Sequence, residues 1–195
     1  MRRVALILLS IATVVAADKD KGRFAPKPAA SYPGRQTLDK ITIAAVPYIS
    51  SDQAASAFGK VNPYQHGILP VLVVIQNDTG KALRLNLDAQ FVDPSNRHLD
   101  AMPAGDVVLY NGVTKAPKLP GTSANPFPRR QKKGPLNTWE IEGRAFSAKL
   151  VPPGESVSGF VYFEATYKEG SKLYVTGIQD AASGKDYFYY EIPMQ

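Results

Sequence analysis

The stretch from residue 67 to residue 91, GILPVLVVIQNDTGKALRLNLDAQF, constrains the fold more than any other part of this chain. Residues 71–75 are a continuous run of aliphatic side chains, most of them β-branched, which predicts a strand that is buried on both faces. From residue 83 to residue 91 apolar and polar residues alternate, which is typical of a strand with one face in a core and one in water. Together they indicate antiparallel β-structure.

The segment 77–80, Asn-Asp-Thr-Gly, separates these two strands. Asn and Asp side chains hydrogen-bond to their own backbone and Gly accepts a positive φ, so the segment predicts a tight turn. We therefore expect residues 71–75 and 83–91 to pair as a β-hairpin.

The first 17 residues predict a secretory signal peptide. Arg2 and Arg3 precede an apolar run over residues 4–15, and Ala16 and Ala17 supply a small-residue cleavage site. The run is shorter than a standard transmembrane helix, and an uncleaved membrane anchor is the alternative. We expect an exported protein, periplasmic or extracellular, with no transmembrane segment after cleavage. Residues 18–37, rich in Lys and Pro, predict a disordered linker.

Composition excludes several kinds of site. The chain has no cysteine, which excludes disulfides, thiolate catalysis and cysteine-based zinc sites. The formal net charge is +6, with basic residues concentrated in the linker and in residues 129–133. Export argues against a nucleic-acid partner, so these charges favour either solvation or contact with an anionic envelope polymer.

Residues 38–195 predict one domain with short strands separated by turn signals. The expected strands cover residues 40–48, 71–75, 83–91, 106–110, 138–142, 146–150, 157–164, 172–178 and 187–192, and residues 99–102 are expected to form a short edge piece. One short helix is expected near 51–58, because Ser50 and Gln53 have capping-box spacing and Gly59 fits the position after the last turn. A Pro- and Gly-rich loop insertion is expected near 111–137.

This pattern predicts an all-β fold, an antiparallel immunoglobulin-like sandwich of about eight strands. The central position in a sheet is expected for residues 157–164, because they are mostly apolar, and Gly159 is expected to mark a bulge or close packing. A small closed barrel is the competing architecture.

The sequence offers little catalytic chemistry. His66 and His98 lack metal-ligand spacing, and no serine lies in a nucleophile motif. A set of carboxylates on or beside strands could act as general acids only if the fold places them in a cleft; they are Asp88, Asp93, Glu140 and Glu142. We therefore expect no catalytic residues, no metal and no cofactor, and a hydrolase that uses loop carboxylates is a further alternative.

Two groups of residues are candidates for binding a partner. The first lies in the insertion: Phe127, Arg129, Arg130, Lys132 and Lys133. The second is aromatic: Trp139, Tyr187 and Tyr189. Tyrosine combines an apolar ring with a polar tip, which suits sugar stacking and protein interfaces. The alternative is a purely structural role, because strands favour aromatic residues.

Two motifs resemble those of a known group of proteins: Leu69-Pro70-Val71 with Asn77-Asp78, and Pro153-Gly154-Glu155 with Gly159-Phe160. Over residues 41–192 the chain resembles exported bacterial proteins of unknown function with an immunoglobulin-like sandwich. This resemblance implies export and fold, and it transfers no catalytic residue.

The resulting hypothesis is a non-enzymatic binding or assembly module of the bacterial cell envelope. Its expected partner is an envelope protein or a polysaccharide. The alternative hypothesis is a carbohydrate- or peptidoglycan-binding domain that uses exposed aromatic residues.

Overall fold

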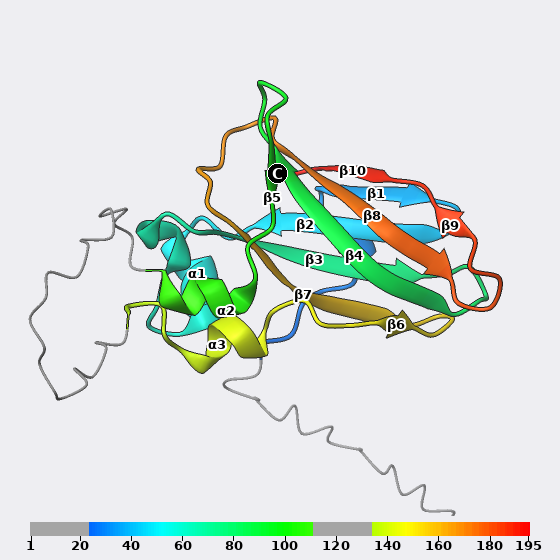
Figure 1. Cartoon of the computed structure of the whole chain (residues 1–195), viewed down its shortest axis with the longest axis horizontal. Coiled ribbons are helices and arrows are strands. Elements are labelled where there is room, and N and C mark those ends of the chain that lie inside the picture. Colours follow the sequence, from blue (N-terminus) through cyan, green and yellow to red (C-terminus); the bar gives the residue numbers. More distant parts are fainter. Residues whose placement is uncertain (1–23, 111–133) are drawn as a thin grey trace, which may run out of the picture.

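The computed structural model describes residues 24–110 and 134–195, which form two antiparallel β-sheets (Figure 1). The first sheet has the order β1-β2-β3-β7 and is made of β1 (Arg35–Leu38), β2 (Ile41–Pro47), β3 (Leu69–Asn77) and β7 (Ser156–Phe163). The second has the order β10-β8-β4-β5, with β4 (Leu83–Val92), β5 (His98–Asp100), β8 (Lys172–Asp180) and β10 (Tyr190–Pro193). In addition, β6 (Leu150–Val151) pairs with β4, and β9 (Asp186–Tyr187) pairs with β8.

The predicted all-β class is confirmed, with ten strands in the described residues where about eight were expected. The main core lies between the sheets and takes side chains from β2, β3, β4, β8 and β10. A second core covers the other face of the first sheet, where Leu72 and Val74 of β3 pack with residues of the helices. Strand β3 is therefore buried on both faces, as its aliphatic run predicted.

Three short helices gather at one end of the molecule, with α1 (Ser51–Phe58), α2 (Ala104–Leu109) and α3 (Trp139–Gly143) side by side (Figure 1). Two 3₁₀ turns, η1 (Ala29–Ser31) and η2 (Pro63–His66), complete the elements. The helix predicted near 51–58 is confirmed with its capping box: the Ser50 hydroxyl accepts from the Gln53 N–H, and the Gln53 side chain accepts from the Ser50 N–H. Among the described residues, no helix has the length and apolar character needed to span a membrane.

The hairpin predicted across residues 77–80 is wrong. Strands β3 and β4 do not pair; β3 lies in the first sheet and β4 in the second, so the segment between them crosses from one sheet to the other. The buried side chain of Asn77 fixes this crossing, because its amide donates to the carbonyls of Lys81, Val151 and Pro152. A turn motif specifies a local reversal of the chain, and it does not specify which strands pair.

Two predicted strands are helices. Residues 106–109 belong to α2, with residue 110 directly after it, and Val107 is the one buried side chain of this helix. Residues 139–142 belong to α3, with residue 138 directly before it, and Ile141 is the buried side chain there. Short apolar runs are ambiguous between strand and helix, and here each helix needs to bury one side chain against the first sheet.

Three further predictions need correction. The expected strand 146–150 is mostly irregular and only β6 (Leu150–Val151) pairs; the expected strand 187–192 is broken into β9 and β10. The part of the linker 18–37 that the structure describes is not disordered, because it contains η1 and most of β1, and Ala29 is fully buried. Residues 1–23 and the insertion residues 111–133 lie outside the described residues.

The central position predicted for residues 157–164 is wrong. Strand β7 is the last strand of the first sheet. Its apolar character has another cause, since isolated bridges from Met102 and Ala145 cover its outer edge. The close packing predicted at Gly159 is confirmed, because a Cβ there would collide with the backbone of Phe146.

Candidate functional site

Helix α3 sets the position of Trp139. Ile141 is buried on the sheet side of this helix, and its carbonyl accepts a 2.8 Å hydrogen bond from the buried Tyr162 hydroxyl. Trp139 remains 68% exposed. Its indole rests on Gly143, one turn later, where an added Cβ would lie only 2.9 Å from the ring atom Cε3. The helix therefore supports the indole close to its own backbone and leaves much of the ring open to solvent.

Arg144 follows α3 directly and joins it to α1. Its Nη1 atom donates to the carbonyls of Ser56, at 3.3 Å, and Ala57, in the last turn of α1. The last carbonyls of a helix lack partners within the helix and carry partial negative charge, so a cation is favourable there. The guanidinium carbon also lies 5.0 Å from the ring centroid of Phe24 and 5.7 Å from that of Trp139, which are cation–π distances. The guanidinium is thus fixed in place by groups from three segments.

These residues line a cavity of about 630 Å³, which we call the aromatic groove. Its walls are made by Phe24, Ala25, Tyr48, Ala55, Ser56, Gly59, Trp139, Glu140 and Arg144. Burial, with a smaller contribution from Tyr32, raises the pKa of Tyr48 to about 12, and Arg144 opposes the shift. The Tyr48 phenol therefore stays protonated at neutral pH.

The aromatic rings of the groove are held by the second core. Tyr48 packs edge-on against the buried ring of Phe160, with 4.9 Å between centroids, and the Phe24 ring lies 5.4 Å from the same ring. Because both rings pack against the buried Phe160, this wall of the aromatic groove is preformed. It combines a flat apolar surface with one cationic donor, Arg144, and one anionic acceptor, Glu140.

The predicted binding residues do not come together in one site. Trp139 lies in the aromatic groove, but Figure 1 places α3 and β9 at opposite ends of the molecule, and Tyr187 and Tyr189 belong to the β9 end. Tyr187 is half-buried against the main core, and Tyr189 stacks on Tyr174 with 5.4 Å between ring centroids. The five insertion residues lie outside the described residues: Phe127, Arg129, Arg130, Lys132 and Lys133.

Sequence reasoning missed Phe24, Tyr48 and Arg144. Phe24 was assigned to a disordered linker, and Tyr48 follows a strand-ending proline without any motif. One signal was available: read as a helix, Trp139, Gly143 and Arg144 have i, i+4 and i+5 spacing, which places them on neighbouring parts of one surface.

The carboxylates named as possible acids lie in two regions: Asp88 is in β4 with Asp93 directly after it, and Glu140 and Glu142 are both in α3. Asp93 is buried in its own turn, where it accepts hydrogen bonds from the backbone N–H groups of Ser95 and Arg97. Asp88 and Asp100 line a pocket of about 220 Å³, below the ~300–1,000 Å³ range of small-molecule sites. Within residues 24–110 and 134–195, no three His, Asp or Glu residues are grouped as metal ligands.

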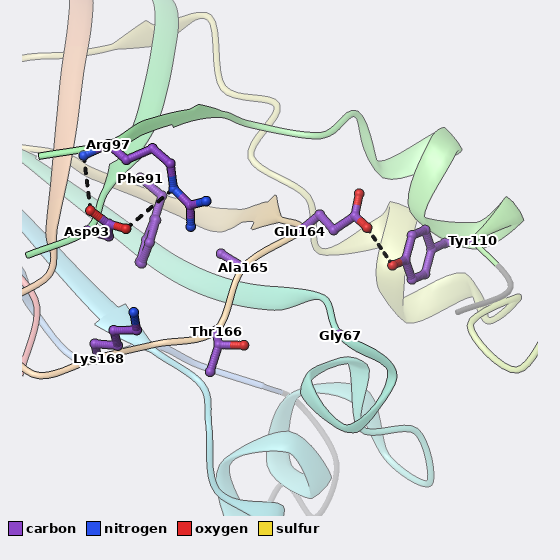
Figure 2. A pocket seen from close by; sticks show the side chains of 9 residues that line it. All are labelled: Gly67, Phe91, Asp93, Arg97, Tyr110, Glu164, Ala165, Thr166 and Lys168. Carbon is purple, nitrogen blue, oxygen red and sulfur yellow. Dashed lines mark hydrogen bonds and ion pairs between the residues drawn. The ribbon is translucent and has the colours of Figure 1, made fainter. Parts of the chain in front are cut away.

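A second cavity, of about 420 Å³, lies where the turn after β4 meets the segment after β7; we call it the polar pocket (Figure 2). Figure 2 shows Arg97 and Lys168 on one side of Ala165, with Glu164 and Tyr110 on the other. The Tyr110 hydroxyl donates a 2.8 Å hydrogen bond to Glu164, which raises the pKa of Tyr110.

The comparisons with protein-family models and with curated proteins provide no role that could be transferred to this chain. No protein-family model matches the chain, and no curated protein shows a significant match to it. The geometry of the aromatic groove and of the polar pocket therefore carries the functional conclusions.

Proposed function

We propose that this protein is a non-enzymatic binding module of the bacterial cell envelope, and that it binds polysaccharide in the aromatic groove. One observation carries the proposal: the indole of Trp139 rests on Gly143 and Arg144 and is 68% exposed at the mouth of a preformed cavity. A single exposed aromatic ring is ordinary on a protein surface, so exposure alone does not mark a site. Trp139 differs from the exposed Phe188 because its ring is supported by Gly143 and Arg144 and lines the aromatic groove.

The chemistry around this indole suits a sugar. A pyranose ring offers apolar C–H groups on its faces and hydroxyl groups around its edge. In the groove, the indole supplies a flat apolar surface, Arg144 supplies donors, and Glu140 supplies acceptors. Because the groove carries one charge of each sign from these two residues, it favours neutral sugars over strongly anionic ones.

Export and the finer fold assignment belong to the same proposal. The signal peptide of residues 1–17 would deliver the protein to the periplasm or the exterior, where polysaccharides are abundant. The two packed antiparallel sheets support an immunoglobulin-like sandwich. This architecture commonly serves as a rigid support for a binding surface.

The test uses the fact that Trp139 is the single tryptophan of the chain. Its fluorescence should change when the purified protein is titrated with soluble, neutral β-linked oligosaccharides such as cellohexaose and chitohexaose. Trp139→Ala should weaken binding, measured by calorimetry, by at least about 30-fold, since a buried aromatic anchor contributes ~2 kcal/mol or more.

The matched control is Phe188→Ala, which removes an aromatic ring that is 85% exposed near β9, at the far end of the molecule. It should bind like the wild-type protein. Equal losses in both variants, or no saturable response to neutral or acidic oligosaccharides, would contradict the proposal.

A further inference from the structure

The polar pocket is separate from the aromatic groove and has a different chemistry. Its two cationic side chains, Arg97 and Lys168, lie on one side, and the carboxylate of Glu164 lies on the other (Figure 2). Between them, Phe91 and Ala165 supply an apolar lining. The pocket therefore carries opposite charges on opposite walls.

The cationic wall is only partly neutralised. Asp93 is 6% exposed, and its Oδ1 atom already accepts hydrogen bonds from the Ser95 hydroxyl and from the N–H groups of Ser95 and Arg97. Its Oδ2 atom lies 3.4 Å from Nε of Arg97, so this contact occupies the inner edge of the guanidinium. Lys168 forms no salt bridge with any described residue.

The anionic wall is also available. Glu164 is exposed, and its Oε1 atom accepts the hydrogen bond from Tyr110. That bond anchors the carboxylate at one end of the pocket, because it joins the segment after β7 to the residue after α2. Within the described chain, the other carboxylate oxygen accepts no side-chain hydrogen bond and joins no salt bridge.

We infer that the polar pocket binds a short zwitterionic peptide, with its carboxylate at Arg97 and Lys168 and its ammonium group at Glu164. A simple anion would be repelled by Glu164, and a simple cation by Arg97 and Lys168, whereas a ligand with both charges satisfies both walls. The volume of about 420 Å³ lies within the ~300–1,000 Å³ range of small-molecule sites. This inference does not depend on polysaccharide binding in the aromatic groove.

The test is a titration of the ¹⁵N-labelled protein, followed by NMR, with three probes: triglycine, N-acetyl-triglycine and triglycine amide. Triglycine should shift the amide signals of residues 93, 95–97 and 164–168. Each blocked peptide lacks one terminal charge and should bind at least about tenfold more weakly.

Two variants assign the walls. Glu164→Gln should abolish the preference for triglycine over its N-acetyl form and keep the preference over the amide. Lys168→Met should reduce the preference for triglycine over triglycine amide and keep the preference for triglycine over N-acetyl-triglycine. Lys185→Met, at an exposed lysine between β8 and β9, is the matched control and should keep both preferences. Equal binding of all three peptides, shifts confined to other regions, or no binding of triglycine would overturn the inference.

Discussion

At the scale of single residues, Asn77 connects the two sheets. Its side chain is fully buried and makes five hydrogen bonds: its amide donates to the carbonyls of Lys81, Val151 and Pro152, and its Oδ1 atom accepts from the Thr79 N–H and hydroxyl. No other residue type offers this number of donors and acceptors in so short a side chain.

We predict that Asn77→Ala lowers the free energy of unfolding by about 3 kcal/mol, because several buried polar groups lose their partner and each unsatisfied group costs ~1–3 kcal/mol. Urea denaturation measures the change. Asn137→Ala, at an exposed position, should alter stability by less than about 0.5 kcal/mol. Equal effects of the two substitutions would show that the hydrogen bonds of Asn77 contribute nothing specific.

A second prediction at this scale concerns pH and Asp180. The carboxylate is buried, and it accepts hydrogen bonds from the Lys81 ammonium group at 2.7 Å and from the N–H groups of Ser183 and Ala182. These contacts, with Lys81 the largest, hold the pKa of Asp180 well below its usual range. Because the pKa is lower in the folded state, the carboxylate stabilises the fold above pH ~4, the unfolded pKa, and this contribution is lost as the pH falls further.

Asp180→Asn should therefore reduce stability at pH 7 and flatten its loss between pH ~4 and ~2, as followed by thermal unfolding across that range. The control is Asp106→Asn, an exposed carboxylate on α2, which should keep the wild-type pH profile. A wild-type profile in the Asp180 variant would contradict the assignment.

At the scale of elements, α3 shapes the aromatic groove although it has only five residues. A Cβ at position 143 would lie 2.9 Å from Cε3 and 3.1 Å from Cζ3 of the Trp139 indole. Only glycine therefore allows the indole to pack directly against the backbone of α3. The position of the Trp139 indole therefore depends on the glycine at position 143.

Gly143→Ala should displace the indole and change its emission, and it should weaken oligosaccharide binding about tenfold while the fold persists. Fluorescence spectra and titrations check both effects. Gly105→Ala in α2 is a matched control, because the nearest atom to its added Cβ, in the Glu142 side chain, is 4.0 Å away. Unchanged emission and affinity in Gly143→Ala would show that the position of the indole does not matter.

At the scale of the whole molecule, the segment 24–38 belongs to the folded unit. Strand β1 pairs with β2, Ala29 is fully buried, and Phe24 packs against Phe160 and Tyr48. A chain that starts at residue 39 should therefore unfold at least about 10 °C below a chain that starts at residue 24, since each kcal/mol lost shifts the midpoint by ~2–4 °C.

The shorter chain should also bind oligosaccharides more weakly, because the aromatic groove loses Phe24. Calorimetry and thermal melts measure the two effects on the same samples. Equal melting temperatures for the two chains would contradict this view of the segment.

Those features that depend on neighbouring residues could be predicted from the sequence. The aliphatic run of β3, the alternation in β4 and the capping box of α1 are all visible in the chain, because burial and capping act over a few residues. Trp139 was identified as a binding candidate for its residue type alone.

The remaining features depend on groups that are distant in the sequence, and only the tertiary structure decided them. Strand pairing is selected by burial over the whole sheet, so a local turn did not reveal that β3 and β4 lie in different sheets. Burial against the first sheet made α2 and α3 helical. The aromatic groove takes Phe24, Tyr48 and Arg144 from three separate segments, and packing against one buried ring, Phe160, and one helix end brings them together.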